Sequence, residues 1–149
     1  YVHLYGSRGS ISDSLVRYRA LIARTRMFVF DVRKGLLTEN GNPVVDGDKV
    51  YSGFGSFHNR PECEMLQARG PLPRGKYRIG KAYQHDHLGP MVMNLEPLPG
   101  TQMFGRSAMR IHGDNRTPDP WDGSHGCVIA SRALREHIDK SQDRILEVI

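Results

Sequence analysis

The stretch RIHGDNRTPDPWDGSHGCVIAS, residues 110–131, is the most informative part of this chain. It begins as a short strand that ends at His112, and a loop rich in Pro, Asp and Gly then leads to Cys127. A loop of this composition folds back readily, so the strand end and the cysteine can lie together. Four alternatives follow for Cys127: a nucleophile, a metal ligand, half of a disulfide, or a core residue.

A cysteine next to a histidine can perform nucleophilic chemistry. The thiolate is the reactive form, and because the free thiol has a pKa of about 8.5 it needs a nearby base, which His112 can supply. A carbonyl or polar side chain on the other ring nitrogen would fix the tautomer of that base. Gly126 lets the backbone approach a bound carbonyl closely, so the amides of Gly126 and Cys127 are candidates for an oxyanion hole.

Two other arrangements stay open at this point. A zinc site could use His112, Asp114, His125 and Cys127, although their spacing matches no common zinc pattern and only one thiolate is close. The chain has two cysteines, so Cys63 and Cys127 could form a disulfide in an oxidising compartment.

Length and composition indicate the class of protein. A chain of 149 residues fits one compact domain, and 38% hydrophobic with 25% charged residues is ordinary for a soluble globular protein. No apolar run approaches the roughly 18 residues of a membrane span, and the first ten residues lack the apolar region of a secretory signal. We therefore expect a globular domain with no membrane insertion.

The chain is basic, with a formal net charge of +5 and a pI near 9.5. Such a charge favours a polyanionic neighbour, for example cell wall or nucleic acid. The basic residues are scattered, with clusters only at residues 17–26 and 74–81, and no aromatic-basic RNA motif or zinc-finger spacing occurs. We therefore expect no nucleic-acid partner.

The pattern along the chain predicts a mainly β domain. A helix is predicted over residues 12–26 and a second one over 131–141, where Ser131 is the expected N-cap. The sequence NGN predicts a hairpin turn at residues 40–42. Residues 1–26 are thus expected to form a helical N-terminal extension, and 27–149 the main domain. Strands are predicted over residues 26–32, 36–39, 76–83, 91–98, 108–113 and 144–149.

Several segments carry a family resemblance when taken in order. IHG at a strand end followed by SHGC resembles the signature of the YkuD-type L,D-transpeptidase catalytic domain. The whole set more closely resembles the type VI secretion L,D-transpeptidase effector family, from about Met27 to the end of the chain. The resemblance implies a YkuD-like β-sandwich or barrel-like fold. The segments are YSGFG (51–55), GPLPRGKYRIG (70–80), LEPL (95–98), MFGRSAMRIHGD (103–114) and SHGCVIAS (124–131).

The resemblance implies roles for individual residues. Cys127 matches the nucleophile, His112 the base, and Gly113 the residue whose carbonyl orients that base. Arg106 matches a residue close to the site; its guanidinium fork would hold the substrate carboxylate, or it would form a structural salt bridge. The expected substrate-binding residues are Arg106, Ser124, His125, Gly126 and Asn59.

Two further positions bear on the substrate. The better-known branch commonly carries Arg or Asn two residues after the cysteine, where this chain has Ile129. A polar contact to the substrate is therefore expected from Arg110 or Arg132 instead. Trp121 lies in the loop, where it either packs over the groove or covers the core.

The resemblance also implies a reaction and a setting. The Cys127 thiolate would attack the bond between the L-centre and the D-centre of a peptidoglycan tetrapeptide stem, and the terminal D-residue would leave. Water would then give a tripeptide, while an amine would give exchange or a cross-link. We expect no metal or organic cofactor. The partners would be peptidoglycan stem peptides and a cognate immunity protein.

The expected setting is that of a secreted antibacterial effector acting in the periplasm of a target bacterium. Two alternatives remain at this point. One is a cell-wall binding module that kept the fold without the chemistry, and the other is a cysteine peptidase or acyltransferase of unrelated fold.

Overall fold

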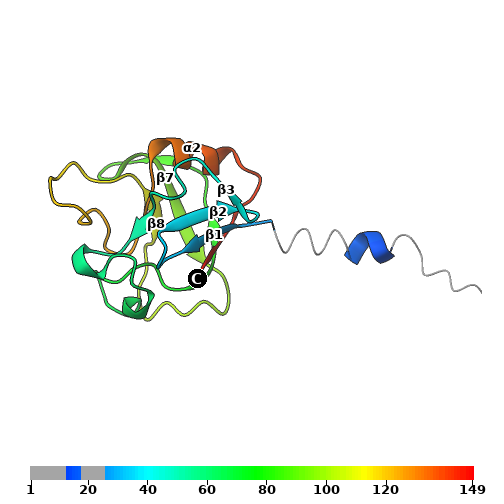
Figure 1. The fold of residues 1–149 in the computed structure, drawn as a ribbon, viewed down its shortest axis with the longest axis horizontal. Helices are drawn as coiled ribbons and strands as arrows, with labels where there is room; N and C mark the ends of the chain where they lie inside the picture. Colours follow the sequence, from blue (N-terminus) through cyan, green and yellow to red (C-terminus); the bar gives the residue numbers. More distant parts are fainter. Residues whose placement is uncertain (1–12, 18–25) are drawn as a thin grey trace, which may run out of the picture.

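The computed structural model describes residues 13–17 and 26–149 (Figure 1). Within this part of the chain there are ten strands in a mixed sheet and few helices, which confirms the predicted mainly β class. Of the helix predicted over residues 12–26, residues 13–17 are helical, Arg26 is not, and the rest lies outside the described residues. None of the helices described is both long and apolar enough to cross a membrane.

The elements follow one another as short strands with a single helix near the end of the domain. They are β1 (Phe28–Asp31), β2 (Leu36–Glu39), β3 (Asn42–Pro43), β4 (Tyr51–Ser52), the 3-10 helices η1 (Gly55–Phe57) and η2 (Pro61–Cys63), β5 (Gly75–Ile79), β6 (Tyr83–His85), β7 (Gly89–Pro97), β8 (Arg110–His112), β9 (Val128–Ile129), α2 (Arg132–Lys140) and β10 (Ile145–Val148).

The predicted hairpin turn is confirmed between β2 and β3. Glu39 pairs with Asn42 across the turn, and the two residues between them, Asn40 and Gly41, both have positive φ. Two central residues with positive φ are the requirement of a type I′ hairpin turn, which Asn-Gly satisfies best. The sequence NGN therefore closes this hairpin for the expected reason.

The prediction of a single strand over residues 76–83 is wrong, because two separate strands occur there. β5 ends at Ile79 and β6 begins at Tyr83. Between them the Arg144 guanidinium donates to the carbonyls of Ile79 (3.4 Å) and Gly80 (2.7 Å). An arginine from the far end of the chain thus binds carbonyls where the predicted strand is interrupted.

The long strand β7 connects two parts of the sheet, one running from β3 to β5 and the other from β8 to β4. The strand order is β3-β2-β1-β10-β5-β7-β8-β9-β4, with β6 paired to β7 beside this path. Along β7, residues 95–97 pair with β5 and residues 93–94 pair with β8. The β1–β10 and β8–β9 pairs are parallel, and the others are antiparallel.

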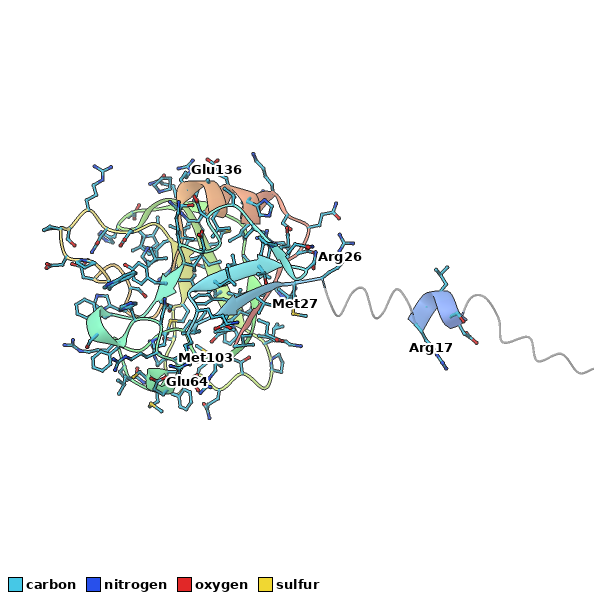
Figure 2. The ribbon with its side chains drawn as sticks, viewed as in Figure 1. Arg17, Arg26, Met27, Glu64, Met103 and Glu136 are labelled. Atoms are coloured by element: carbon cyan, nitrogen blue, oxygen red, sulfur yellow. The ribbon has the colours of Figure 1, made fainter. Side chains whose placement is uncertain are left out.

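A single core forms where both parts of the sheet meet. Most of its largest fully buried side chains come from strands β1, β5, β7, β8, β9 and β10 and from α2, and the side-chain view shows the interior filled (Figure 2). Their packing fixes the positions of β8 and β9, the two strands that carry the motif residues. These side chains include Phe28, Phe30, Tyr77, Leu72, Met93, Ile111, Val128, Leu134, Ile138 and Leu146.

Helix α2 begins where the sequence predicts it. The Ser131 side chain accepts a hydrogen bond from the Leu134 amide (3.1 Å), which confirms Ser131 as the N-cap. The helix buries Leu134 and Ile138 in the core, and it lies at the top of the domain in Figure 1. The predicted helix after Cys127 is therefore confirmed.

Candidate active site

Strands β8 and β9 bring the two ends of the motif together. They pair in parallel with Ile111 opposite Val128, and both of these side chains lie in the core. Extending this register by one residue puts Arg110 opposite Cys127. Because side chains alternate along a strand, Arg110, His112 and Cys127 share the face away from the core. Strand spacing and rise put the Cα atoms of His112 and Cys127 about 8 Å apart.

His112 is held in one tautomer. The side chain is buried, with 4% of its surface exposed, and Nδ1 lies 2.7 Å from the carbonyl oxygen of Gly113. A carbonyl only accepts, so Nδ1 carries the proton and donates, and Nε2 is the nitrogen that can accept one. Burial lowers the pKa of His112, the Gly113 carbonyl opposes this, and the positive charges of Arg135 and Arg110 add to the lowering. The imidazole is thus a neutral base at neutral pH.

Cys127 is a partly buried thiol beside two arginines. Burial raises the pKa of its thiol, while the backbone N–H of Arg110 and the charges of Arg110 and Arg106 oppose the rise. Because burial raises the pKa of the Cys127 thiol and lowers that of His112, the pair rests as neutral thiol and neutral imidazole. No hydrogen bond joins the sulfur to His112 in the described part of the chain. Catalytic hydrogen bonds are often long without substrate and tighten in the Michaelis complex.

Neither of the two alternatives for the cysteines is present in the structure. Cys63 and Cys127 are both free thiols in the described region. Across residues 13–17 and 26–149, no group of three or more His, Cys, Asp and Glu side chains is placed to hold a metal ion. Asp114 instead accepts hydrogen bonds from Tyr51 and from the Asn115 amide.

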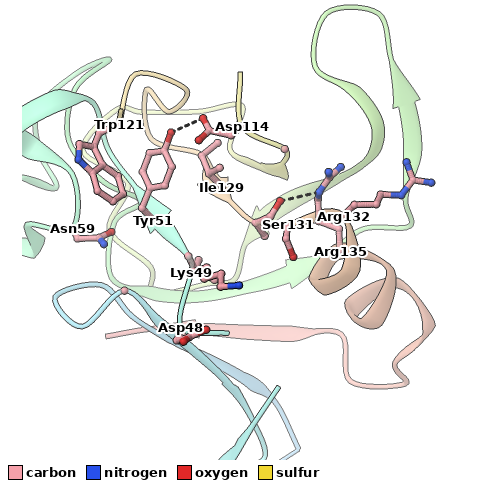
Figure 3. A pocket seen from close by; sticks show the side chains of 14 residues that line it. Asp48, Lys49, Tyr51, Asn59, Asp114, Trp121, Ile129, Ser131, Arg132 and Arg135 are labelled. Atoms are coloured by element: carbon pink, nitrogen blue, oxygen red, sulfur yellow. Dashed lines mark hydrogen bonds between the residues drawn. The ribbon is translucent and has the colours of Figure 1, made fainter. Parts of the chain in front are cut away.

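Tyr51 ties together both ends of the loop between the histidine and the cysteine. Its hydroxyl donates to Asp114 Oδ1 (2.8 Å) and accepts from the Gly123 amide (3.2 Å). Figure 3 shows the bond between Tyr51 and Asp114 at one wall of a cavity. Further out, the Thr117 hydroxyl donates to the Asp122 carboxylate. The loop is therefore closed at its base and again near its tip.

Ser124 organises the turn before the cysteine. Its buried hydroxyl donates to the Cys127 carbonyl (2.5 Å) and accepts from the amides of Gly53 (3.0 Å) and Gly126 (3.2 Å). The Ser52 hydroxyl donates to the Gly126 carbonyl (3.1 Å) from β4. Ser124 therefore contacts backbone rather than a substrate. Because the Gly126 amide is already bonded, only the Cys127 amide stays a candidate for the oxyanion hole.

Arg106 differs most from its expected arrangement. It is 6% exposed, and its two Nη atoms donate to four backbone carbonyls: Glu64 (2.6 Å), Pro71 (2.6 Å), Gly70 (2.8 Å) and His125 (3.1 Å). These bonds use all four Nη hydrogens, and Arg106 has no ion pair among the described residues. It is therefore neither a fork open to a substrate carboxylate nor half of a salt bridge.

Gly126 is the glycine that this packing requires. Its φ is +133°, and a Cβ atom there would collide with Arg106 Nη2 and crowd the Met109 side chain. Gly126 therefore lets the turn before Cys127 approach the buried Arg106 guanidinium. Because Arg106 and Met109 fill the space beside Gly126, that space is closed to substrate.

His125 points away from this buried turn. The side chain is exposed, its Nδ1 donates to the Ala68 carbonyl (3.0 Å), and its ring stacks on Phe54 with centroids 5.0 Å apart. The guanidinium carbon of Arg69 lies over the Phe54 ring, 5.4 Å from its centroid. His125 thus keeps a fixed place on the wall of a cavity that also contains Cys127.

Two cavities flank the Cys127 and His112 positions. The smaller one, about 300 Å³, is lined at the start of the paired strands by Met109 and Cys127. The larger one, about 620 Å³, is lined at their far end by Gly113 and Ile129 (Figure 3). Cys127 thus lines the smaller cavity, and the larger one begins at Gly113, the residue after His112.

The remaining residues from the sequence line these cavities. Asn59 lines the larger cavity, and its Oδ1 accepts from the Ser52 amide (3.0 Å). Ile129 and Arg132 line it as well, whereas Arg110 is placed beside the cysteine. Trp121 lines the same cavity and is 41% exposed, so it belongs to the groove rather than to the core cover.

Three site residues escaped the sequence-based prediction. Tyr51 and Ser52 lie in the quoted segment YSGFG, but nothing in that segment says that it pairs with the cysteine strand. Arg135 donates from α2 to the carbonyls of Ala130 (3.0 Å) and Pro90 (2.6 Å). It reads in sequence as one more basic residue of an amphipathic helix.

The site contains the cysteine and the oriented histidine that the sequence predicts, and the comparison with known families shows the class, a type VI secretion effector of the L,D-transpeptidase kind. The model of the Tlde1 domain matches residues 47–145, which is most of the chain, and the protein belongs to this family of type VI secretion effectors. The matched region runs from before β4 to the start of β10 and includes every site residue discussed above. No curated protein matches the chain.

Proposed function

We propose that this protein is a cysteine-dependent L,D-carboxypeptidase and L,D-transpeptidase that acts on peptidoglycan tetrapeptide stems, with Cys127 as nucleophile and His112 as base. The observation that carries the proposal is the tautomer of His112. The Gly113 carbonyl holds the Nδ1 proton, so Nε2 is the acceptor, on the same strand face as the Cys127 thiol. A base oriented by a third group beside a nucleophile is the general arrangement of nucleophilic catalysis.

The reaction proceeds in two halves. Nε2 of His112 takes the Cys127 proton as the sulfur attacks the carbonyl carbon of the third stem residue. The C–N bond to the terminal D-residue then breaks, His112 returns the proton to the departing amine, and a thioester remains. In the second half His112 deprotonates water or an acceptor amine, which attacks the thioester carbonyl. The thiolate leaves and regains its proton from His112.

Arginine charges assist the step in which negative charge forms on sulfur. Arg110 and Arg106 both lower the pKa of Cys127 against the effect of burial. Their positions are fixed by hydrogen bonds, Arg110 to the Ala108 carbonyl and to the Tyr83 hydroxyl, so little reorganisation accompanies the reaction. The Cys127 amide would donate to the oxyanion of the tetrahedral intermediate.

The two cavities divide the substrate at the scissile bond. The smaller cavity suits the single terminal D-residue that leaves, and the larger one suits the stem residues that stay on the enzyme. Lys49 and Arg132 line the larger cavity in exposed ion pairs with Asp46 and Glu136. Exposed pairs are worth little, so both cations can turn to stem carboxylates.

The setting of this activity is part of the proposal. The catalytic region, residues 27–149, would be a YkuD-like domain, with residues 1–26 as an extension. The effector would act in the periplasm of a target bacterium, and a cognate immunity protein would protect the producing cell by covering the cleft. The family membership supports secretion and a cell-wall target.

The pH dependence of the reaction follows from the burial of His112. Its pKa lies below the ordinary value of 6.5, because burial disfavours the charged imidazolium. The base must be neutral to take the thiol proton, so activity persists until the pH falls through this lowered pKa. We expect the acid limb of kcat/KM for tetrapeptide cleavage to have its midpoint below pH 6.5. A midpoint at or above that value would contradict a buried His112 as the base.

The proposed activity is tested by incubating purified, reduced protein with sacculi and separating the muropeptides by mass. We expect tetrapeptide stems to become tripeptides, and added D-amino acids to appear at the fourth position when exchange competes with water. Stems of unchanged composition, with protein still bound to the sacculi, would indicate a binding module. Cleavage of protein peptides but not of stems would indicate a cysteine peptidase instead.

A further inference from the structure

The larger cavity has an aromatic platform at its edge. Trp121 stacks on His58 with ring centroids 4.0 Å apart and planes at 5°, and its edge meets Tyr51 at 5.0 Å. His58 is itself fixed, because its Nδ1 donates to the Gly55 carbonyl (2.6 Å), and the Trp121 carbonyl accepts from the Gly55 amide (2.7 Å). The indole is thus held rigidly from one side, while 41% of the residue stays exposed.

The stacking of Trp121 on His58 is more than the loop needs for its own stability. The loop is already closed by Tyr51, Asp114 and Gly123 at its base. A large aromatic ring that is immobilised on one face and open on the other offers binding area at little cost in conformational entropy. Figure 3 shows Trp121 and Asn59 at the same end of the cavity, so a polar amide accompanies the ring.

The distance from Cys127 identifies which part of the substrate reaches this platform. Ile129 lies two residues, or about 7 Å, beyond Cys127, and it pairs with Tyr51 across a strand spacing of about 5 Å. With the ring contact to Trp121, the indole is on the order of 10–15 Å from the cysteine. Three extended residues span about 10–11 Å. The three stem residues retained after cleavage therefore bring their sugar attachment point to Trp121.

We propose that the Trp121 end of the larger cavity binds the amino sugar that carries the stem, so that the effector selects glycan-linked stems over free stem peptides. This inference rests on the proposed function for the direction of the stem in the cleft. An amino sugar has a C–H face that packs on an aromatic ring, and hydroxyl and amide groups that an amide such as Asn59 can bond. The stem is covalently joined to that sugar, so both bind as one ligand.

The sole tryptophan of the chain makes this site directly observable. In the Cys127→Ala variant, which cannot turn over, we expect a disaccharide-tetrapeptide to change the Trp121 emission and to bind about 10-fold tighter than the free tetrapeptide. Unchanged emission, or equal affinity for the two ligands, would overturn the inference. A free tetrapeptide that changes the emission as strongly would assign the platform to peptide instead.

Variants extend the test to turnover. We expect Trp121→Ala to reduce the ratio of kcat/KM for the disaccharide-tetrapeptide over the free tetrapeptide from about 10 to about 1, and Trp121→Tyr to keep part of it. Met65→Ala serves as the matched control, because Met65 is 49% exposed and lines neither cavity. An unchanged ratio in Trp121→Ala would contradict the inference. The two proposals fail separately. If the disaccharide-tetrapeptide changes the Trp121 emission but the wild type does not cleave it, only the proposed function is refuted. If the wild type cleaves both ligands with equal kcat/KM, only the sugar site is refuted.

Discussion

The Cys127→Ala variant is expected to lose at least about 10³-fold in kcat/KM for tetrapeptide cleavage, without loss of fold. Alanine removes the sulfur that forms the thioester, and neither His112 nor the arginines can replace it. The side chain is small and lies on the face away from the core, so the free energy of unfolding should change little. Mass analysis of muropeptides measures the first effect, and urea unfolding the second.

A histidine variant is the control for the pair. We expect His112→Ala to lose activity to a similar extent, and the double variant to be no worse than either single one, because groups that act as a unit are not additive. Losses that multiply in the double variant would show that the two residues act independently. Full activity in Cys127→Ala would remove the nucleophile from the proposal altogether.

The fold was predictable where a strand has enough residues to show a pattern. Residues 36–39 and 91–98 were assigned close to their observed bounds, and the helix began at its predicted cap. β4 and β9 contain two residues each, which is too short for any alternation. They are strands because their neighbours supply partners: Tyr51 pairs with Ile129, and Ser52 with Val128.

The candidate site was predictable where the chemistry is local. Gly113 directly follows His112, so the bond that fixes the tautomer needs no distant partner. Ser124 and Gly126 were found by motif, but their contacts lie inside the turn and on β4 rather than with a substrate. Positions far apart in the sequence, such as Arg106 and the carbonyls near residues 64–71, become neighbours only through the fold.

The Arg106→Met variant is expected to have a free energy of unfolding about 3–5 kcal/mol lower than that of the wild type. Methionine has similar bulk but no donors, so the carbonyls of Glu64, Gly70, Pro71 and His125 lose their common partner in a buried place. Glu64 is labelled in Figure 2 near the lower part of the domain. The urea midpoint of purified protein measures the change.

Two further variants separate charge from geometry. Arg78 is exposed on β5, and Arg78→Met should change the free energy of unfolding by no more than about 0.5 kcal/mol. Arg106→Lys keeps the charge near Cys127 but presents a point donor in place of the planar fork, so we expect an intermediate loss. If Arg106→Met instead unfolded like the wild type and lost only substrate affinity, Arg106 would bind the substrate carboxylate after all. The buried fork would then have to open to substrate, because its four Nη hydrogens are bonded to backbone in the free protein.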